Sequence, residues 1–301
     1  MKWQGRRMSE NVEDRRSQSS GGSGVNLGGL FGGGGGSGCG LKGGLGVLVI
    51  ALVIWLLGGN PMQVLSLLGD MGDLGVGTET TTGYTAPAAD DQWAQFVEVV
   101  LADTEDVWSA VFKENGLTYR KPTLVLYSGY TSSPCGTASN STGPFYCSAD
   151  EKIYVDLSFF DEMQKQFNAG GDFAYAYVIA HEVGHHVQKL FGTLEKVNNT
   201  RARSNEKRSN QLSVLLELQA DFYAGVWANR TEQMFQSLEE GDIDEALNAA
   251  SAIGDDRLQE QAQGYSVPDS FTHGTSKQRH DWFYKGYRTG DIKQGDTFGG
   301  I

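Results

Sequence analysis

The stretch FAYAYVIAHEVGHHVQKL, residues 173–190, predicts a buried helix that carries two histidines on one face. Its apolar residues recur at steps of three and four, which is the period of a helix. His181 and His185 are four residues apart, so their side chains lie one turn apart and can hold one metal ion together. Glu182 borders the same place, where it can act on water held by the metal. The stretch is typical of the zinc-binding helix of a metallopeptidase.

A second helix, expected at about residues 210–228, offers the third ligand that a catalytic zinc site needs beside its open position. Glu217 and Asp221 are four residues apart on this helix and stand among apolar residues. We predict that Glu217 is the third ligand and that Asp221 accepts a hydrogen bond from the far ring nitrogen of a ligating histidine. A solvated acidic face is the alternative, but such a face would carry more charge.

The other histidines give weaker signals. His273 lies in a polar, turn-like stretch at residues 271–276 that could return to the cleft. There its imidazole would steady the negative oxygen that develops during hydrolysis, although a structural role in the turn is an equally good interpretation. His186 points about 100° away from the preceding ligand around the helix, so it is expected to pack or to face solvent. The candidate catalytic residues are thus Glu182 and His273.

The N-terminal part is dominated by Gly and Ser at residues 17–44, a composition typical of a flexible linker. Residues 43–59 carry no charge and are just long enough to span a membrane. Basic residues outnumber acidic ones before this run, which places the N-terminus in the cytoplasm. A cleaved signal peptide is the alternative, but its basic region would be far too long. We expect a disordered cytoplasmic tail over residues 1–42, a transmembrane signal anchor over residues 43–59, a linker over residues 60–89 and a zinc metallopeptidase domain over residues 90–301, outside the cytoplasmic membrane.

Charge and cysteine content agree with this arrangement. The net charge of −13 argues against a nucleic-acid partner, because phosphate binding needs a basic face. Cys135 and Cys147 flank a turn-rich loop that a disulfide would close in an oxidising compartment. Cys39 lies on the linker side and is expected to stay reduced. Three free cysteines in a cytosolic protein are the alternative.

The expected elements predict an α+β fold in which a small sheet packs on the motif helix. One strand, at residues 153–157, is expected to offer an edge to an extended peptide. From Tyr265 the sequence reads as a Gly- and Ser-rich tail. The elements before that tail are expected as a helix at 93–112, strands at 124–127 and 153–157, a helix at 159–167, the motif helix, a polar span at 195–207, the second ligand-bearing helix and further helical residues at 231–263.

With these features the chain resembles the bacterial neutral zinc metallopeptidases, membrane-anchored proteins related to the gluzincins. The resemblance is carried by residues 135–136, 143–147, 153–156, 181–186, 217–221, 224–228 and 273–276. It implies a zincin-like fold, one zinc ion, a glutamate ligand matching Glu217 and a carboxylate one turn later matching Asp221. Phe222 departs from the family pattern, which favours a cysteine there.

The expected function is therefore that of a membrane-anchored, zinc-dependent peptidase in which Glu182 serves as general base. The alternative is a catalytically silent, membrane-tethered scaffold with a structural zinc site. Glu182 argues against that alternative, because a structural site has closed four-ligand coordination and needs no adjacent base.

Overall fold

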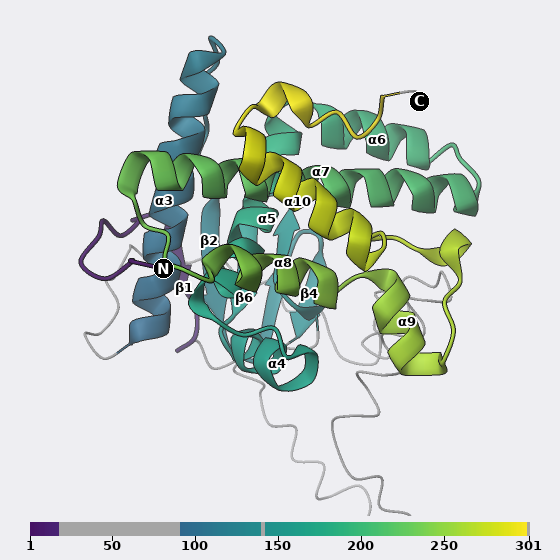
Figure 1. Cartoon of the computed structure of the whole chain (residues 1–301), viewed down its shortest axis with the longest axis horizontal. Helices are drawn as coiled ribbons and strands as arrows, with labels where there is room; N and C mark the ends of the chain where they lie inside the picture. The colour runs from purple at the N-terminus through teal and green to yellow at the C-terminus, as the bar shows by residue number, and fades with distance from the viewer. Residues whose placement is uncertain (18–90, 140–141, 300–301) are drawn as a thin grey trace, which may run out of the picture.

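The computed structural model describes residues 1–17, 91–139 and 142–299, and these residues form an α+β fold, as the sequence predicts (Figure 1). Helices make up most of it, beside one four-stranded and one two-stranded sheet. The described strands are β1 (Val12–Asp14), β2 (Thr123–Tyr127), β3 (Tyr130–Ser133), β4 (Gly136–Ser139), β5 (Phe145–Cys147) and β6 (Lys152–Asp156). The described α-helices are α3 (Gln92–Glu114), α4 (Ser158–Phe167), α5 (Asp172–Leu190), α6 (Thr193–Arg201), α7 (Glu206–Phe235), α8 (Asp242–Ala252), α9 (Asp255–Gln263) and α10 (Ser276–Thr289).

The four-stranded sheet has the order β1-β2-β6-β5. Its first three strands run parallel, and β5 pairs antiparallel with β6, with Tyr146 opposite Ile153. The strand predicted at residues 153–157 is therefore central, and the expectation that it offers an edge is wrong. The edge belongs to β5, whose three residues are too few to show the alternation that marks a strand in sequence.

The predicted disulfide between Cys135 and Cys147 is present, with an S–S distance of 2.07 Å. Cys135 directly precedes β4, and Cys147 ends β5. The bridge therefore ties the two-stranded sheet to the edge strand β5.

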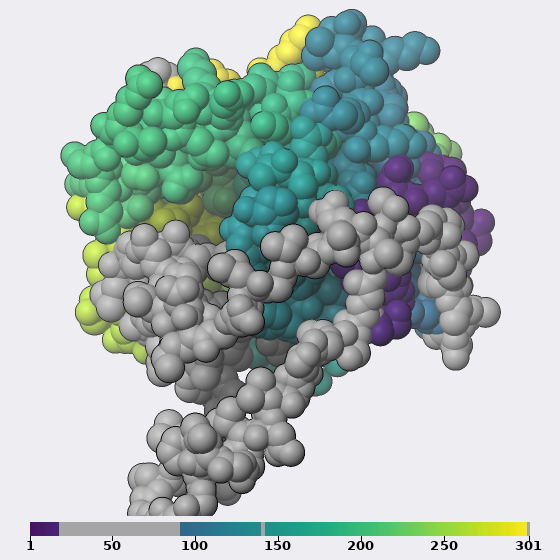
Figure 2. Space-filling model, turned by 180° about the vertical axis from the view of Figure 1, so that it is seen from behind, coloured from purple at the N-terminus to yellow at the C-terminus, as the bar shows by residue number. Residues whose placement is uncertain are grey.

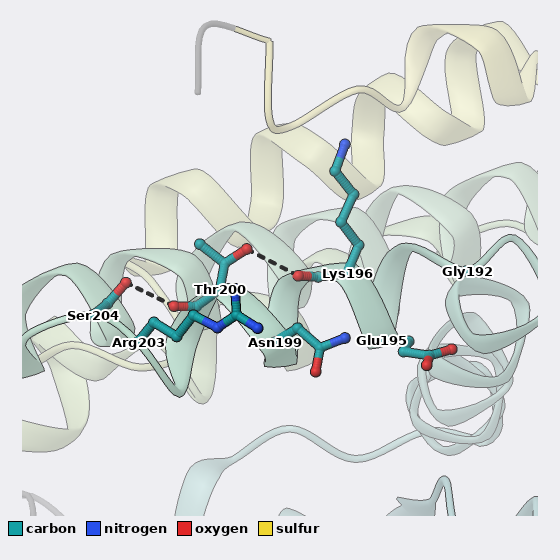
Figure 3. A pocket seen from close by; sticks show the side chains of 7 residues that line it. All are labelled: Gly192, Glu195, Lys196, Asn199, Thr200, Arg203 and Ser204. Carbon is teal, nitrogen blue, oxygen red and sulfur yellow. Dashed lines mark hydrogen bonds between the residues drawn. The ribbon is translucent and has the colours of Figure 1, made fainter.

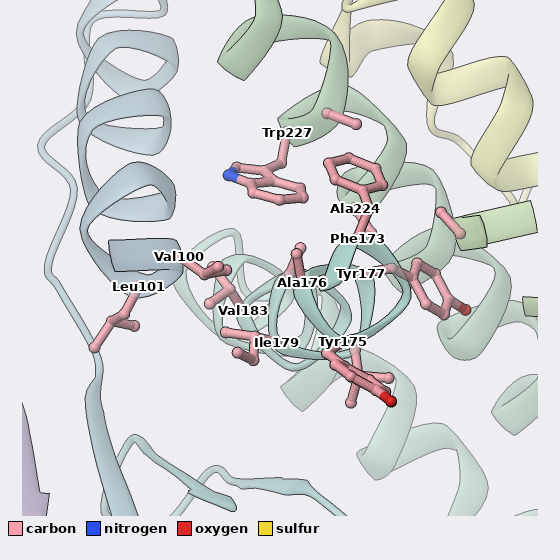
Figure 4. Close-up of a cluster of buried hydrophobic side chains, with 14 of the residues drawn as sticks. Val100, Leu101, Phe173, Tyr175, Ala176, Tyr177, Ile179, Val183, Ala224 and Trp227 are labelled. Atoms are coloured by element: carbon pink, nitrogen blue, oxygen red, sulfur yellow. The ribbon is translucent and has the colours of Figure 1, made fainter. Parts of the chain in front are cut away.

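α5 is the central helix, and apolar side chains surround most of it (Figure 4). Its Phe173 stacks on Trp227 of α7, with ring centroids 5.6 Å apart. Ile179 and Val183 belong to the same buried cluster as Val100 of α3. A helix that is apolar all round has to be covered on several sides, and α3, α7 and α8 all contact α5.

Glycines let the helices of this core approach closely. A Cβ atom on Gly184 of α5 would lie 2.9 Å from the carbonyl oxygen of Ala220 in α7. A Cβ atom on Gly225 of α7 or Gly286 of α10 would lie 2.0 Å from a carbonyl oxygen of the opposite helix. Since no real Cβ fits at such distances, the motif helix, α7 and α10 are held backbone against backbone (Figure 1).

The C-terminal part is more helical than the sequence predicts. The polar span at residues 195–207 contains most of α6, and the expected irregular tail contains α10. α10 begins with a capping box, in which the side chains of Thr275 and Gln278 each bond the other's backbone N–H. The composition of α10 does not indicate a packed helix, because only Phe283, Gly286 and Arg279 are buried.

Residues 1–17 are part of the fold, since β1 extends the sheet beside β2. The expectation of a disordered tail is therefore wrong for these residues. The rest of that tail, the apolar run at 43–59 and the linker at 60–89 lie outside the described residues. Among the helices that the structure describes, none combines the length and the apolar character needed to cross a membrane.

Candidate metal centre

α5 and α7 bring together the three residues predicted as metal ligands, His181, His185 and Glu217. One side-chain ligand atom from each lies within 4.8 Å of the other two. Nε2 of His181 is 3.1 Å from Oε2 of Glu217, and Nε2 of His185 is 3.5 Å from its Oε1. Two imidazoles and one carboxylate are a donor set that zinc takes in catalytic sites.

The second ring nitrogen of each histidine is held from outside the cluster. Nδ1 of His181 lies 2.8 Å from Oδ1 of Asp221, which is the contact predicted for this carboxylate. Nδ1 of His185 lies 2.9 Å from Oε1 of Gln188. The amide nitrogen of Gln188 donates to the carbonyl oxygen of Leu216 at 2.7 Å, so the amide oxygen is the acceptor. With both Nδ1 atoms donating outward, both Nε2 atoms are left facing Glu217, and the residues present fit a zinc ion.

Asp221 is the centre of a buried network that the sequence reveals only in part. It is fully buried and accepts a hydrogen bond from the Tyr177 hydroxyl at 2.5 Å. Arg279 of α10, also buried, donates to both of its oxygens, from Nε at 2.8 Å and from Nη2 at 2.9 Å. A buried carboxylate needs such partners because it has lost its hydration. Arg279 is not found from the sequence, because a tail is predicted where α10 lies; the capping box at Thr275 is the sequence signal for the start of this helix.

The pKa values of this network follow from its charges. Burial disfavours a protonated His181, yet Asp221 and Glu217 raise its pKa to about 10. Burial also disfavours an ionised Asp221, but Arg279 and His181 lower its pKa to about 2. Burial opposes the ionised form of Glu217 as well, while His185 and His181 hold its pKa well below the usual value. The cluster therefore keeps its carboxylates ionised and favours positive charge between them.

Glu182 lies next to this cluster and is only 8% exposed. Burial raises its pKa, although the two neighbouring histidines and a hydrogen bond from the backbone N–H of Tyr146 act in the opposite direction. A carboxylate whose pKa is raised toward neutrality takes up a proton more readily, as a general base must. Tyr146 belongs to β5, so the edge strand borders the candidate base.

His186 packs in the interior and joins α5 to the sheet. Its Nδ1 lies 3.0 Å from the Tyr146 hydroxyl, and its Nε2 lies 2.6 Å from the carbonyl oxygen of Arg120. Burial lowers its pKa, so the ring is neutral, donates from Nε2 and accepts at Nδ1. Through Tyr146, His186 helps to hold β5 beside Glu182.

His273 stands apart from the three candidate ligands and is paired with Asp255 at the start of α9. Its Nδ1 lies 3.3 Å from Oδ1 of Asp255. The other oxygen of Asp255 accepts the backbone N–H groups of Thr272, His273 and Gly274, at 2.7, 2.6 and 3.0 Å. His273 also contributes to lowering the pKa of Glu217, after the larger effects of burial and the two nearer histidines, so it lies within electrostatic reach of the cluster. Sequence reasoning missed Asp255, an acidic residue at an ordinary helix start.

A surface pocket of about 770 Å³ runs along α6 (Figure 3). It is lined by Gly192, Glu195, Lys196, Asn199, Thr200, Arg203 and Ser204. Two of its hydroxyl groups, on Thr200 and Ser204, donate to carbonyl oxygens one turn earlier. None of the three candidate ligands lines this pocket, so it is separate from the histidine cluster.

Comparison with known proteins gives matches over nearly the whole chain. The family described as "Putative neutral zinc metallopeptidase" matches residues 1–298. The uncharacterized protein YpfJ of Escherichia coli is 49% identical over 299 residues, which cover 99% of each chain. The uncharacterized protein Rv2575 of Mycobacterium tuberculosis is 42% identical over 214 residues, which cover 68% of this chain and 71% of the relative. No solved structure matches the chain.

Proposed function

Because the chain belongs to the neutral zinc metallopeptidase family, we propose that it hydrolyses peptide bonds at a single zinc ion held by His181, His185 and Glu217. One observation carries this proposal: three ligand atoms converge from two helices directly beside a buried glutamate, Glu182. A scaffold with a structural zinc site would have no use for that glutamate.

When bound, zinc polarises a peptide carbonyl and lowers the pKa of water. Glu182 accepts a proton from the attacking water and delivers it to the nitrogen of the leaving amine. Asp221 and Gln188 hold the two imidazoles so that their Nε2 atoms stay directed at one point.

In this proposal His273 steadies the negative charge that develops on the carbonyl oxygen. Asp255 supports it by accepting from its ring and from three backbone N–H groups around it. These hydrogen bonds fix the position of the turn. The His273 ring needs such a fixed position if it is to stabilise the negative charge on the carbonyl oxygen.

The substrate is proposed to be a peptide or protein that extends along β5. The outer side of this edge strand has no partner strand in the described sheet, and its Tyr146 borders Glu182. An extended peptide can pair with such an edge through its backbone. The acidic balance of the chain speaks against nucleic acid, and the apolar residues 43–59 are proposed to attach it to a membrane.

The proposal is tested by incubating the purified full-length chain with a mixed peptide pool and reading the products by mass spectrometry. We expect cleavage that a chelator abolishes, and a loss of about 100- to 10,000-fold in Glu182→Gln. Glu260→Gln, an exposed glutamate of α9, is the matched control and should retain activity. A wild-type chain that holds one zinc ion yet is as inert as Glu182→Gln would favour the scaffold instead.

A further inference from the structure

Residues 1–17 are bound to the surface made by α3 and the outer edge of β2. β1 lies parallel to β2, with Val12 opposite Leu124. The backbone of Leu124 donates to the carbonyl oxygen of Asn11 at 2.9 Å, and that of Arg15 donates to Leu126 at 2.7 Å. Figure 2 shows this segment, in purple, against the blue of α3. The segment therefore completes the sheet of the domain and is not an appendage to it.

Side chains of the segment also enter the core. Val12 is 5% exposed and belongs to the main hydrophobic cluster. Trp3 packs edge-on against Phe96 of α3, with ring centroids 5.6 Å apart. The backbone N–H of Ser9 donates to the carbonyl oxygen of Glu98 at 3.0 Å. Removing the segment would expose both an apolar surface and unpaired backbone groups of β2.

Two basic residues of the segment, Arg6 and Arg7, have acidic partners on α3. Arg6 lies 2.7 Å from the buried Asp103, and Arg7 lies 2.7 Å from Asp106 and 3.2 Å from the buried Glu105. These arginines contribute to the positive balance that, in the sequence alone, places the N-terminus in the cytoplasm. In the fold the same arginines pair with acidic side chains, of which Asp103 and Glu105 are buried and have lost their hydration.

We propose that residues 1–17 and the domain formed by residues 91–299 lie on the same side of the membrane, with α3 and the β2 edge as the binding site for the segment. Neighbouring strands are about 5 Å apart, whereas the hydrocarbon core of a bilayer is about 30 Å thick. A strand cannot pair with a neighbour across that distance. On this proposal, the apolar residues 43–59 do not carry the chain from one compartment to the other.

The test compares the accessibility of two single cysteines in intact cells. Glu10→Cys reports on the segment and Lys113→Cys on α3; both positions are exposed, and both variants carry Cys39→Ser. A membrane-impermeant maleimide is applied before and after the membrane is opened, and the Cys39→Ser chain without an added cysteine gives the background. We expect both positions to be labelled in intact cells, or both only after opening. Labelling of one position while the other is protected would overturn the proposal.

A second measurement asks whether the contact exists in the full-length chain. Val12→Asp buries an unpaired carboxylate in the core and should lower the unfolding midpoint by about 5–10 °C. Glu10→Ala, two residues away and exposed, should leave it unchanged. Equal midpoints for the two variants would contradict the docking of the segment. Neither measurement depends on peptidase activity, so the result stands apart from the proposed function.

Discussion

The two histidines of the candidate metal centre lie on one helix, yet they are supported in different ways. His181 is held by a carboxylate, Asp221, which Arg279 pairs with through two hydrogen bonds. His185 is held by the neutral amide of Gln188. The support of His181 connects α5, α7 and α10 through buried charges. Loss of one partner would leave a buried charge unpaired, so this support is stable only when all its partners are present.

The second support consists of neutral hydrogen bonds. The Gln188 amide donates to the carbonyl oxygen of Leu216 and to the side chain of Gln219, which in turn donates to the carbonyl oxygen of Gly295. None of the groups in this series of hydrogen bonds is titratable. The support of His181 by Asp221 and Arg279 therefore stabilises the site through charge. The support of His185 by Gln188 orients the ring in a way that does not change with pH.

The largest effect is expected when Asp221 loses the guanidinium group of Arg279. Arg279→Met should lower the free energy of unfolding by about 3–5 kcal/mol, because it leaves a buried carboxylate without its guanidinium partner. Arg288→Met, an exposed arginine of the same helix, should change it little. Urea denaturation of the two metal-free variants measures the difference. Similar values would show that the buried ion pair does not support the site.

Removing the carboxylate itself should weaken zinc binding. Asp221→Ala should lower zinc affinity by roughly 10–100-fold, because His181 loses the acceptor that orients its ring. Asp244→Ala, an exposed aspartate of α8, is the control. Competition with a chelating dye measures both, and an unchanged affinity in Asp221→Ala would contradict the role given to this residue.

The ionised Asp221 should also make the free energy of unfolding depend on pH in the acid range. Arg279 and His181 lower the pKa of Asp221 to about 2 in the fold from its ordinary value of 3.8, so its contribution is complete above pH 3.8 and is lost as the pH falls through 2. The shift corresponds to roughly 2 kcal/mol. Stability curves of metal-free wild type and Asp221→Asn should converge over this range. Curves that stay parallel would show that Asp221 is not the group responsible.

The neutral support should give the smallest effect. Gln188→Met keeps the side-chain volume but removes the acceptor of His185, and we expect a loss of zinc affinity that is smaller than that of Asp221→Ala and at most about tenfold. Gln261→Met, an exposed glutamine of α9, controls for the substitution. The acid dependence below pH 3.8 should be retained. A loss as large as that of Asp221→Ala would mean that the two supports are equivalent.

The ligand-bearing helices could be predicted because their information is local. In α5 the apolar period and the spacing of His181 and His185 occur within one stretch, and the same holds for Glu217 and Asp221 in α7. Each pair needs only the geometry of its own helix.

β1 and β5 could not be predicted because their stability depends on distant residues, and only the capping box of α10 is visible in the sequence. β1 has three residues and pairs with β2, more than a hundred positions away. α10 is polar over most of its length, and its place is set by the close contact of Gly286 with α7 and by the ion pair of Arg279 with Asp221. Gln188 gives no signal in the sequence for the same reason, since a glutamine becomes informative only once its contact with the His185 ring is known.

Whether α5 and α7 hold one zinc ion together is measured by the zinc content of Glu217→Ala beside that of Glu182→Gln. Both variants are dialysed against a mild chelator as full-length chains and analysed by elemental mass spectrometry. Glu182→Gln should retain one zinc ion per chain, as the wild type does, because the ligand set is intact. Glu217→Ala should lose it, because two imidazoles remain. Full retention of zinc by Glu217→Ala would show that the third ligand lies elsewhere.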